Sequence, residues 1–251
     1  MTSVHSRKIL IIGAAGSIGD AVAQAFATPT SDLVLSDLSA PADMAALVAK
    51  AGSCRFIRTD LSQPKSIEAL FDSLGSRLDV LVNAAGIVSK GPSNQISENE
   101  WDRVIAVNLK SVFLTCQKAL SLMAPHKSGR VVNIGSVIAQ NGGNARSWLL
   151  PEEQLSSSNA AYAASKAGVH ALTAYLGREY ARFGVTVNAI APGPIATSMI
   201  ANYPQALIDL IPVRRLGTPE EVADAVLFLA STQAGFINGA TLDMNGGLHI
   251  R

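Results

Sequence analysis

Tyr162 and Lys166 lie four positions apart in a segment with helical periodicity, so their side chains share one face of the predicted helix. A phenol has a pKa near 10 in water and is a poor base at neutral pH. An ammonium at roughly 4 Å, with an effective dielectric near 20, contributes about 4 kcal/mol, or about three pKa units. The spacing therefore predicts a phenol that exchanges protons near neutral pH. Ser136, just after a predicted strand, is expected to converge with this pair.

A glycine-rich turn offers a place for a nucleotide. Gly13, Gly16 and Gly19 fall between a predicted strand and a predicted helix. Glycines at such positions allow a tight turn, let the backbone approach a pyrophosphate and let the helix pack on its strand. The free N–H groups at the start of that helix favour phosphate. We therefore predict a dinucleotide site above this turn.

The second predicted strand ends at Asp37, whose carboxylate can accept hydrogen bonds from an adenosine ribose. The same charge would repel a 2′-phosphate, and the sequence has no Arg or Lys near Asp37 or inside the glycine turn. The sequence thus favours NAD over NADP, unless Asp37 is only a solvated turn residue. Asp60, after the third strand, is expected either to hold the adenine amino group or to cap its loop.

Composition argues against several other classes of protein. The chain has 251 residues, a net charge of +1 and no long run of like charges, so neither nucleic acid nor a membrane surface is an expected partner. Its two cysteines, Cys54 and Cys116, are expected to be buried free thiols. No histidine or cysteine pair has the spacing of a metal site. The start of the chain lacks a signal-peptide pattern, so we expect a cytoplasmic protein.

Short apolar runs and helix-period segments alternate along the chain. The predicted strands are Lys8 to Ile12, Leu33 to Ser36, Arg55 to Arg58, Val80 to Val82, Arg130 to Ile134, Val185 to Ile190 and Thr241 to Met244. The predicted helices are Ser17 to Ala27, Ala42 to Ala51, Ser66 to Leu74, Glu98 to Met123, Ala160 to Phe183 and Pro219 to Ala230. Thr218 and Glu221 are expected to form a capping box. This pattern predicts an α/β fold, a doubly wound parallel sheet of seven strands with helices on both faces.

A set of motifs, in register along the chain, resembles the short-chain dehydrogenase/reductase family. The set comprises Gly13-x-x-Gly16-x-x-Gly19, Asp60, Asn83-Ala-Ala-Gly86, Asn108, Ile134-Gly-Ser136, Tyr162-Ala-Ala-Ser-Lys166, Pro192-Gly-Pro-Ile-Ala-Thr197 and Gly239-Ala-Thr-Leu-Asp-Met-Asn-Gly-Gly247. The resemblance is closest to the compact members of about 250 residues. It implies a single Rossmann-fold NAD(P)-binding domain over residues 1–251.

The resemblance also implies roles for individual residues. Tyr162 would move the alcohol proton, Ser136 would hold the substrate oxygen, Lys166 would bind the nicotinamide ribose, and Asn108 would support a water that relays protons from Lys166. These four form the expected catalytic set. The expected cofactor contacts are Gly13, Ser17, Ile18, Gly19, Asp37, Asp60, Leu61, Asn83, Ala84, Gly86, Tyr162, Lys166, Pro192, Gly193, Ile195 and Thr197.

Two features depart from the family pattern. Ile12 and Ser17 stand where compact members usually carry Thr and Gly, which leaves the phosphate contact at Ser17 less well supported than those at Gly13 and Gly19. Ser136 and Tyr162 are 26 positions apart, about twice the usual spacing. The additional segment, about residues 146–158, is interpreted either as a flap over the substrate, formed by Trp148, Leu149 and Leu150, or as surface decoration.

Residues 198–215 resemble the family's mobile substrate lid. Expected substrate contacts are Ile138, Trp148, Met199 and Tyr203, and the apolar lid face suggests a partly apolar substrate. Arg214 and Arg215 are expected to be solvated rather than to bind an acidic group.

The sequence thus predicts an NAD-dependent oxidoreductase that interconverts an alcohol and a carbonyl compound. The alternatives are a 3-oxoacyl-carrier-protein reductase-like enzyme and a non-catalytic NAD-binding sensor or scaffold. Family members are commonly tetramers built on the two long helices and the last strand. We therefore expect a homotetramer, with a small-molecule substrate as the other partner.

Overall fold

Seven segments rich in β-branched and apolar residues form one parallel sheet. The computed structural model describes residues 6–143, 155, 157–200 and 203–250. The strands are β1 (Arg7–Ile12), β2 (Ser31–Asp37), β3 (Ser53–Arg58), β4 (Val80–Asn83), β5 (Gly129–Ile134), β6 (Val185–Pro192) and β7 (Thr241–Met244). Every residue of β4 and β6 is buried, as expected for strands covered on both faces.

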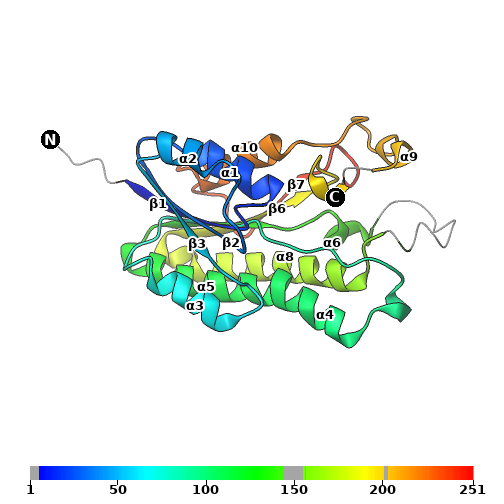
Figure 1. Cartoon of the computed structure of the whole chain (residues 1–251), viewed down its shortest axis with the longest axis horizontal. Helices are drawn as coiled ribbons and strands as arrows, with labels where there is room; N and C mark the ends of the chain where they lie inside the picture. Colours follow the sequence, from blue (N-terminus) through cyan, green and yellow to red (C-terminus); the bar gives the residue numbers. More distant parts are fainter. Residues whose placement is uncertain (1–5, 144–154, 156, 201–202, 251) are drawn as a thin grey trace.

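Helices cover both faces of this sheet (Figure 1). One face carries α1 (Ser17–Phe26), α2 (Met44–Lys50) and α10 (Pro219–Ala230), and the other carries α3 (Pro64–Asp72), α4 (Glu98–Ile105), α5 (Ser111–Met123) and α8 (Ala160–Tyr180). Successive residues of β1 alternate between two apolar cores, with Ile9 and Ile11 in one and Leu10 and Ile12 in the other. This alternation is the pleat of a strand that packs against helices on both sides.

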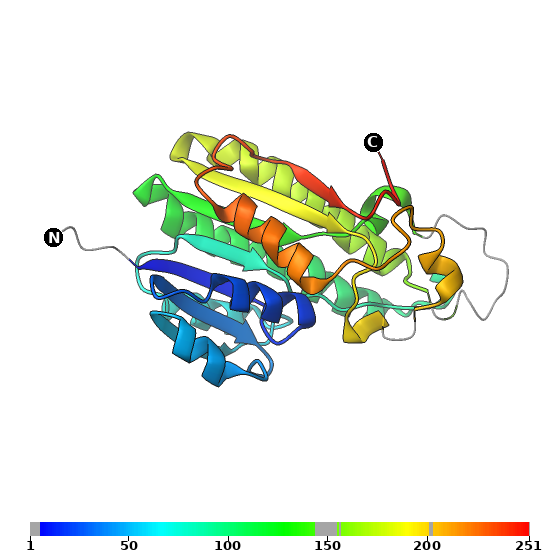
Figure 2. The ribbon, with the colours of Figure 1, turned by 90° about the horizontal axis from the view of Figure 1, so that it is seen from above.

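The strand order β3-β2-β1-β4-β5-β6-β7 reverses direction beside β1. Figure 2 shows the two halves of the sheet on either side of the blue β1, with the red β7 at the far edge. Ligands of such sheets bind beyond the carboxyl ends of the strands, at the point of reversal. The predicted doubly wound sheet and its seven strands are therefore confirmed, and the glycine turn after β1 lies at the switch point.

The predicted helix from Glu98 to Met123 is wrong in one respect, because it is not continuous. A π-helical segment, η2 (Ala106–Lys110), separates α4 from α5. The wider turn carries Asn108, which is fully buried. Periodicity alone cannot reveal such an insertion, since the apolar stripe continues on both sides of it.

The sequence analysis did not predict several short elements. These are α6 (Ile138–Asn141), α9 (Gln205–Ile208) and the 3-10 turns η1 (Ser93–Gln95), η3 (Ala124–His126) and η5 (Ser198–Ile200). The predicted helix from Ala160 to Phe183 ends in a 3-10 turn, η4 (Ala181–Phe183). A helix of a single turn is too short to show a periodic pattern of apolar residues. The predicted capping box is confirmed: Thr218 Oγ accepts from Glu221 N at 3.2 Å, and the Glu221 carboxylate accepts from Thr218 N at 2.9 Å.

Within the described ranges, no helix combines the length and the apolar character needed to cross a membrane. The same ranges contain no group of three or more His, Cys, Asp or Glu side chains arranged to hold a metal ion.

Candidate active site

Ser136, Tyr162 and Lys166 meet at the carboxyl end of β5. Asn159 caps α8 by accepting hydrogen bonds from the backbone N–H groups of Ala161 and Tyr162, which sets the first turn of the helix. The side chain of Ser136 lies close enough to the Tyr162 hydroxyl to lower the pKa of the phenol. Lys166 Nζ lies 5.9 Å from the centre of the Tyr162 ring and donates to the carbonyl of Ile134 at 2.8 Å. The structure thus brings together the three residues that the sequence grouped.

Burial dominates the protonation of this trio. Burial raises the pKa of Tyr162 above its ordinary value, and the influence of Ser136 only partly opposes the rise. Burial also lowers the pKa of Lys166, which is 4% exposed, to about 8. The influence that lowers the phenol pKa comes from Ser136, and the expected lowering by the Lys166 ammonium is not found.

Asn108 lies behind Lys166 and bridges two segments. Its Oδ1 accepts from the backbone of Ile87 at 2.8 Å, and its Nδ2 donates to the carbonyl of Ile87 and to Ser165 Oγ. A Cβ on Gly86 would lie 3.2 Å from Lys166 Nζ and 3.6 Å from Asn108 Oδ1. Gly86 therefore leaves the space in which the ammonium and the amide sit.

The glycine turn has the shape that a pyrophosphate requires. Gly13 has a φ of +85°, and a Cβ there would lie 2.4 Å from the backbone nitrogen of Ala85. A Cβ on Gly19 would lie 2.0 Å from the carbonyl oxygen of Gly13. Gly16 caps α1 without a side chain, so the first-turn N–H groups, including those of Ser17 and Ile18, face a ligand site. These residues fit a dinucleotide phosphate.

Asp37 stands at the end of β2, against the glycine turn. Its Oδ2 accepts from Ala15 N at 3.0 Å and its Oδ1 from Leu38 N at 2.7 Å. Each carboxylate oxygen retains a second acceptor position. A ribose hydroxyl can therefore still bind there.

The expectation that no basic residue lies near Asp37 is wrong. Arg58 is the register partner of Asp37 on the adjacent strand β3, and its Nε donates to the carbonyl of Leu38 at 3.2 Å. The two residues are 21 positions apart, so only strand pairing brings them together.

The side chain of Asp60 caps the loop that follows β3. Its Oδ1 accepts from Ser62 N at 2.9 Å and from Ser62 Oγ at 2.7 Å. These two bonds, with a smaller contribution from the charge of Arg58, lower the pKa of Asp60. The neighbouring Leu61 packs on the apolar core beneath α3.

The side chain of Asn83, at the carboxyl end of β4, points into the protein. Its Nδ2 donates to Asn133 Oδ1 and its Oδ1 accepts from Thr115, both at 2.9 Å. Asn133 in turn donates to Thr173 at 3.0 Å. This buried network ties β4 and β5 to α5 and α8, so Asn83 supports the site from below. Its neighbour Ala84 continues the strand by donating its N–H to the carbonyl of Ile12.

The end of β6 and the residues that follow it form another wall of the site. The carbonyl of Pro192 accepts from Val137 N, directly after Ser136, and Gly193 N donates to the carbonyl of Met244. Ile195 bridges in parallel to Gly217, and the carbonyl of Thr197 accepts from Ile200 N at 3.1 Å. These bonds place residues 192–197 beside the serine turn.

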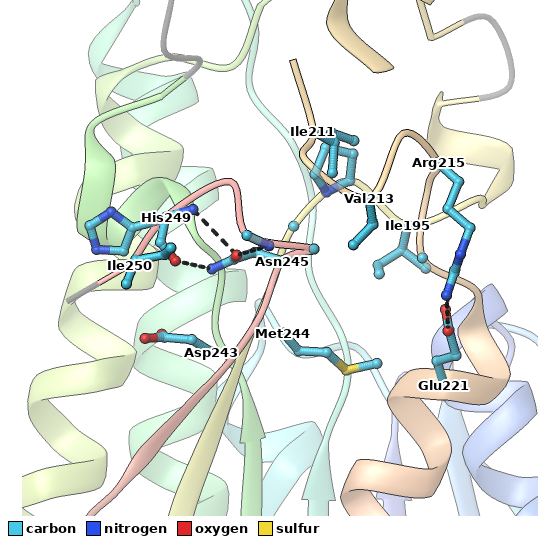
Figure 3. A pocket seen from close by; sticks show the side chains of 15 residues that line it. Ile195, Ile211, Val213, Arg215, Glu221, Asp243, Met244, Asn245, His249 and Ile250 are labelled. Carbon is cyan, nitrogen blue, oxygen red and sulfur yellow. Dashed lines mark hydrogen bonds and ion pairs between the residues drawn. The ribbon is translucent and has the colours of Figure 1, made fainter. Parts of the chain in front are cut away.

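A cavity of about 490 Å³ lies between this wall, the lid and the C-terminal turn (Figure 3). Asn245 exchanges hydrogen bonds with the backbone of His249 on one side, while Arg215 pairs with Glu221 on the other. Ser136, Tyr162 and Lys166 are not among its lining residues. The cavity therefore adjoins the lid, and Ser136, Tyr162 and Lys166 lie outside it.

The structure places the expected substrate residues only in part. Ile138 begins α6, and its N–H donates to Ser136 Oγ at 3.3 Å. Tyr203 precedes α9 in the lid. Trp148 lies outside the described residues, and for Met199 only the backbone is described, in η5. The end of the additional segment is anchored, because Ser158 bridges to Lys90 and Ser157 accepts from Gly91 N at 3.0 Å.

His170 is a site residue that the sequence analysis missed. It follows Lys166 by one helical turn on α8, and its Nε2 accepts from the backbone N–H of Ser136 at 3.4 Å. A Cβ on Gly135 would lie 2.1 Å from that nitrogen, so the imidazole packs directly on the turn. The spacing from Tyr162 through Lys166 to His170 was the available signal.

Residues 13–249 match the family model described as enoyl-(acyl carrier protein) reductase. The chain is 34% identical to a (3R)-3-hydroxyacyl-CoA dehydrogenase of Canis lupus familiaris, with 98% of each chain covered. It is 36% identical to a 3-oxoacyl-[acyl-carrier-protein] reductase of Synechocystis sp., with 99% of each covered. Among solved structures, a 2-deoxy-D-gluconate 3-dehydrogenase of Agrobacterium tumefaciens with bound NADP aligns with a TM-score of 0.84 and 34% identity, over 98% of this chain and 97% of that one.

Proposed function

The chain belongs to the short-chain dehydrogenase/reductase family, and we propose that it interconverts an alcohol and a ketone or aldehyde with Tyr162 as the general acid/base. Membership makes it an NAD(P)-dependent oxidoreductase that acts on CH–OH or carbonyl groups. A bound nicotinamide supplies the hydride chemistry, and the protein orients the reactants and manages the proton. We treat residues 1–251 as one cofactor-binding domain.

The convergence of Tyr162 and Ser136 beside the buried Lys166 is the observation that carries this proposal. In oxidation the Tyr162 phenolate oxygen takes the alcohol proton and becomes a phenol, and in reduction the phenol gives that proton to the carbonyl oxygen and becomes the phenolate. Ser136 Oγ holds the reacting oxygen next to that hydroxyl. A charged Lys166 favours the phenolate form, and Asn108 supports the relay of protons beyond it.

The cofactor site combines the glycine turn with Asp37. The unoccupied acceptor positions of Asp37 support binding of the unphosphorylated adenosine ribose, so we propose a preference for NAD. Residues of the β4, β5 and β6 ends would then line the nicotinamide end.

We further propose that substrate access is controlled by the lid, residues 198–215, and by the additional segment, about residues 146–158. In the described part of the lid, Leu207 and Ile211 are buried while Val213 is exposed. An apolar face of this kind supports a partly apolar substrate. Ile138, Trp148, Met199 and Tyr203 remain the proposed contacts.

A second candidate activity is reduction of a 3-oxoacyl thioester. It is favoured by the relatives, one named a (3R)-3-hydroxyacyl-CoA dehydrogenase and another a 3-oxoacyl-[acyl-carrier-protein] reductase. The two candidates share the same proton chemistry and differ in the substrate that the lid admits.

We further propose a homotetramer. An apolar groove of about 510 Å³ runs along α4, α5 and α8, lined by Leu109, Phe113, Leu172 and Tyr175 among others. Phe113 and Tyr175 are exposed in the single chain, and burial in an interface would remove them from water. Light scattering should report a tetramer for the wild type and a smaller species for Phe113→Glu.

The deciding experiment is a turnover screen with both nicotinamide cofactors. Secondary alcohols, polyols and hydroxy acids would be tested for oxidation, and ketones and acetoacetyl-CoA for reduction. Tyr162→Phe should lower kcat by at least about 100-fold while cofactor binding persists. Tyr180→Phe, at the far end of the same helix, is the matched control and should retain full activity. Cofactor binding without turnover of any substrate would instead favour a sensor or scaffold.

A further inference from the structure

Tyr162 lies in the first turn of α8, the part of a helix that the helix itself holds least. The first four N–H groups of an α-helix have no partner within it, so a group outside the helix must bind them. Asn159 supplies that group here, because its Oδ1 accepts from Ala161 N at 3.1 Å and from Tyr162 N at 3.4 Å. The backbone position of the proposed acid/base therefore depends on where the Asn159 side chain is held.

The other half of the Asn159 amide is held by a segment that is distant in sequence, the loop that follows β4. Its Nδ2 donates to Ser89 Oγ at 2.7 Å and to the carbonyl of Lys90 at 3.2 Å. Its backbone N–H donates to the carbonyl of Ser89 at 3.2 Å. Asn159 is 6% exposed and Ser89 is 2% exposed, so these hydrogen bonds are shielded from water. We refer to Ser89, the Lys90 carbonyl and Asn159 as the latch.

Two backbone contacts extend the latch toward the additional segment. Lys90 bridges antiparallel to Ser158, and Gly91 N donates to the carbonyl of Ser157 at 3.0 Å. The chain thus runs along residues 89–91 before it enters α8.

Chain connectivity cannot take the place of the latch. Ser136 and Tyr162 are 26 positions apart, and a long connection constrains the distance between its ends only weakly. Contacts outside the connection must therefore set where α8 begins relative to the turn that carries Ser136.

We propose that Asn159 and Ser89 are positioning residues for the reaction, because through the latch the loop after β4 sets the place of the Tyr162 hydroxyl beside Ser136. The inference rests on the proposed role of Tyr162 and extends it to residues that act through the backbone. Loss of the latch allows the first turn of α8 to fray, which moves the phenol away from the reacting oxygen. A displacement of about 1 Å can reduce a rate about 100-fold.

The kinetic test separates the latch from the helix cap. Ser89→Ala removes the hydroxyl that Asn159 Nδ2 binds and leaves the cap in place, so it should lower kcat at least about 5-fold and change cofactor affinity less than about 2-fold. Asn159→Ser retains a good N-cap residue but has no amide to bind the loop. It should unfold at higher urea than Asn159→Ala, while kcat should be low in both variants.

A second measurement needs no substrate. Hydrogen exchange followed by mass spectrometry reports the protection of the backbone N–H groups of Ala161 and Tyr162. In Ser89→Ala and Asn159→Ser these groups should exchange at least about 10-fold faster than in the wild type. Residues 172–180, at the far end of α8, should keep their exchange rates.

Asp43→Ala is the matched control. Asp43 caps α2, on the opposite face of the sheet, by accepting from Ala46 N at 3.1 Å. This variant also loses a helix cap, but it should retain kcat at saturating cofactor and the exchange rates of Ala161 and Tyr162.

The proposal is overturned if Ser89→Ala leaves the exchange rates unchanged, or leaves kcat unchanged on a substrate that the wild type turns over. It is also overturned if Asn159→Ser behaves as the wild type, which would make Asn159 an ordinary cap, or if kcat and cofactor affinity fall equally. Faster exchange at Ala161 and Tyr162 supports it even where no tested alcohol or ketone turns over. In that case the proposed catalytic function fails while the latch stands.

Discussion

The backbone N–H of Ser136 donates to Nε2 of His170, 3.4 Å away, and so ties the serine turn to the helix that carries Tyr162 and Lys166. One turn earlier on that helix, Lys166 binds the carbonyl of Ile134. Two side chains of α8 thus hold the two ends of the Ile134–Ser136 turn. The relative position of Ser136 and Tyr162 depends on both.

His170→Leu should therefore lower kcat while leaving cofactor affinity intact. Loss of one hydrogen bond, worth about 1 kcal/mol, corresponds to roughly a 5-fold decrease if Ser136 shifts away from the reacting oxygen. His170→Gln retains an acceptor and should recover part of the rate. Steady-state kinetics on a substrate from the turnover screen would check this, and an unchanged kcat in His170→Leu would argue against the positioning role.

Lys166 should make the stability of the protein depend on alkaline pH. Its pKa is lowered from 10.5 to about 8, so the folded state is penalised for carrying this charge below about pH 8. Between about pH 8 and 10.5 the unfolded chain binds the extra proton, and stability of the folded state rises with pH. The full effect corresponds to about 3 kcal/mol.

Lys166→Met removes this contribution and serves as the comparison. The variant should unfold at higher urea than the wild type at pH 7, and the difference should shrink as the pH rises above 8. Urea titrations at several pH values, read by circular dichroism, would measure it. A difference that stays constant from neutral to strongly alkaline pH would contradict the lowered pKa.

The glycine turn should tolerate a methyl group at only one of its three glycines. Gly13→Ala and Gly19→Ala place a Cβ at 2.4 Å and 2.0 Å from backbone atoms, and Gly13 also has a positive φ of +85°. Each should reduce the free energy of unfolding by about 1 to 3 kcal/mol or more. Gly16→Ala meets its nearest atom only at 3.4 Å, so it should lower stability by no more than about 1 kcal/mol, the preference for Gly over Ala at the start of a helix. Thermal unfolding of the three variants would rank them.

The thiols of the native protein should react slowly. Burial raises the pKa of Cys116 to about 12 and also raises that of Cys54. Only the thiolate is strongly nucleophilic, so both should resist a thiol-specific reagent at neutral pH, Cys116 the more strongly. Labelling in native buffer and in urea, followed by mass spectrometry, provides the measurement. Rapid labelling of Cys116 in the folded state would be the contrary result.

Much of this protein is determined by local patterns. The apolar runs and helix periods predicted all seven strands and the main helices, because the period of burial is a property of neighbouring residues. The four-residue step from Tyr162 to Lys166 likewise predicted a shared helix face, and Thr218 with Glu221 predicted a helix start. Such relationships join residues that are only a few positions apart, so they can be recognised without knowledge of the rest of the chain.

The tertiary structure decided what depends on distant segments. Arg58 meets Asp37 only because β3 pairs with β2, and His170 meets Ser136 only because α8 packs across the end of β5. The pKa of Tyr162 rises because the fold removes water from the phenol, a quantity that charge spacing alone does not contain. Local periodicity thus determined which elements form, while pairing and desolvation determined which side chains meet and in what state of protonation.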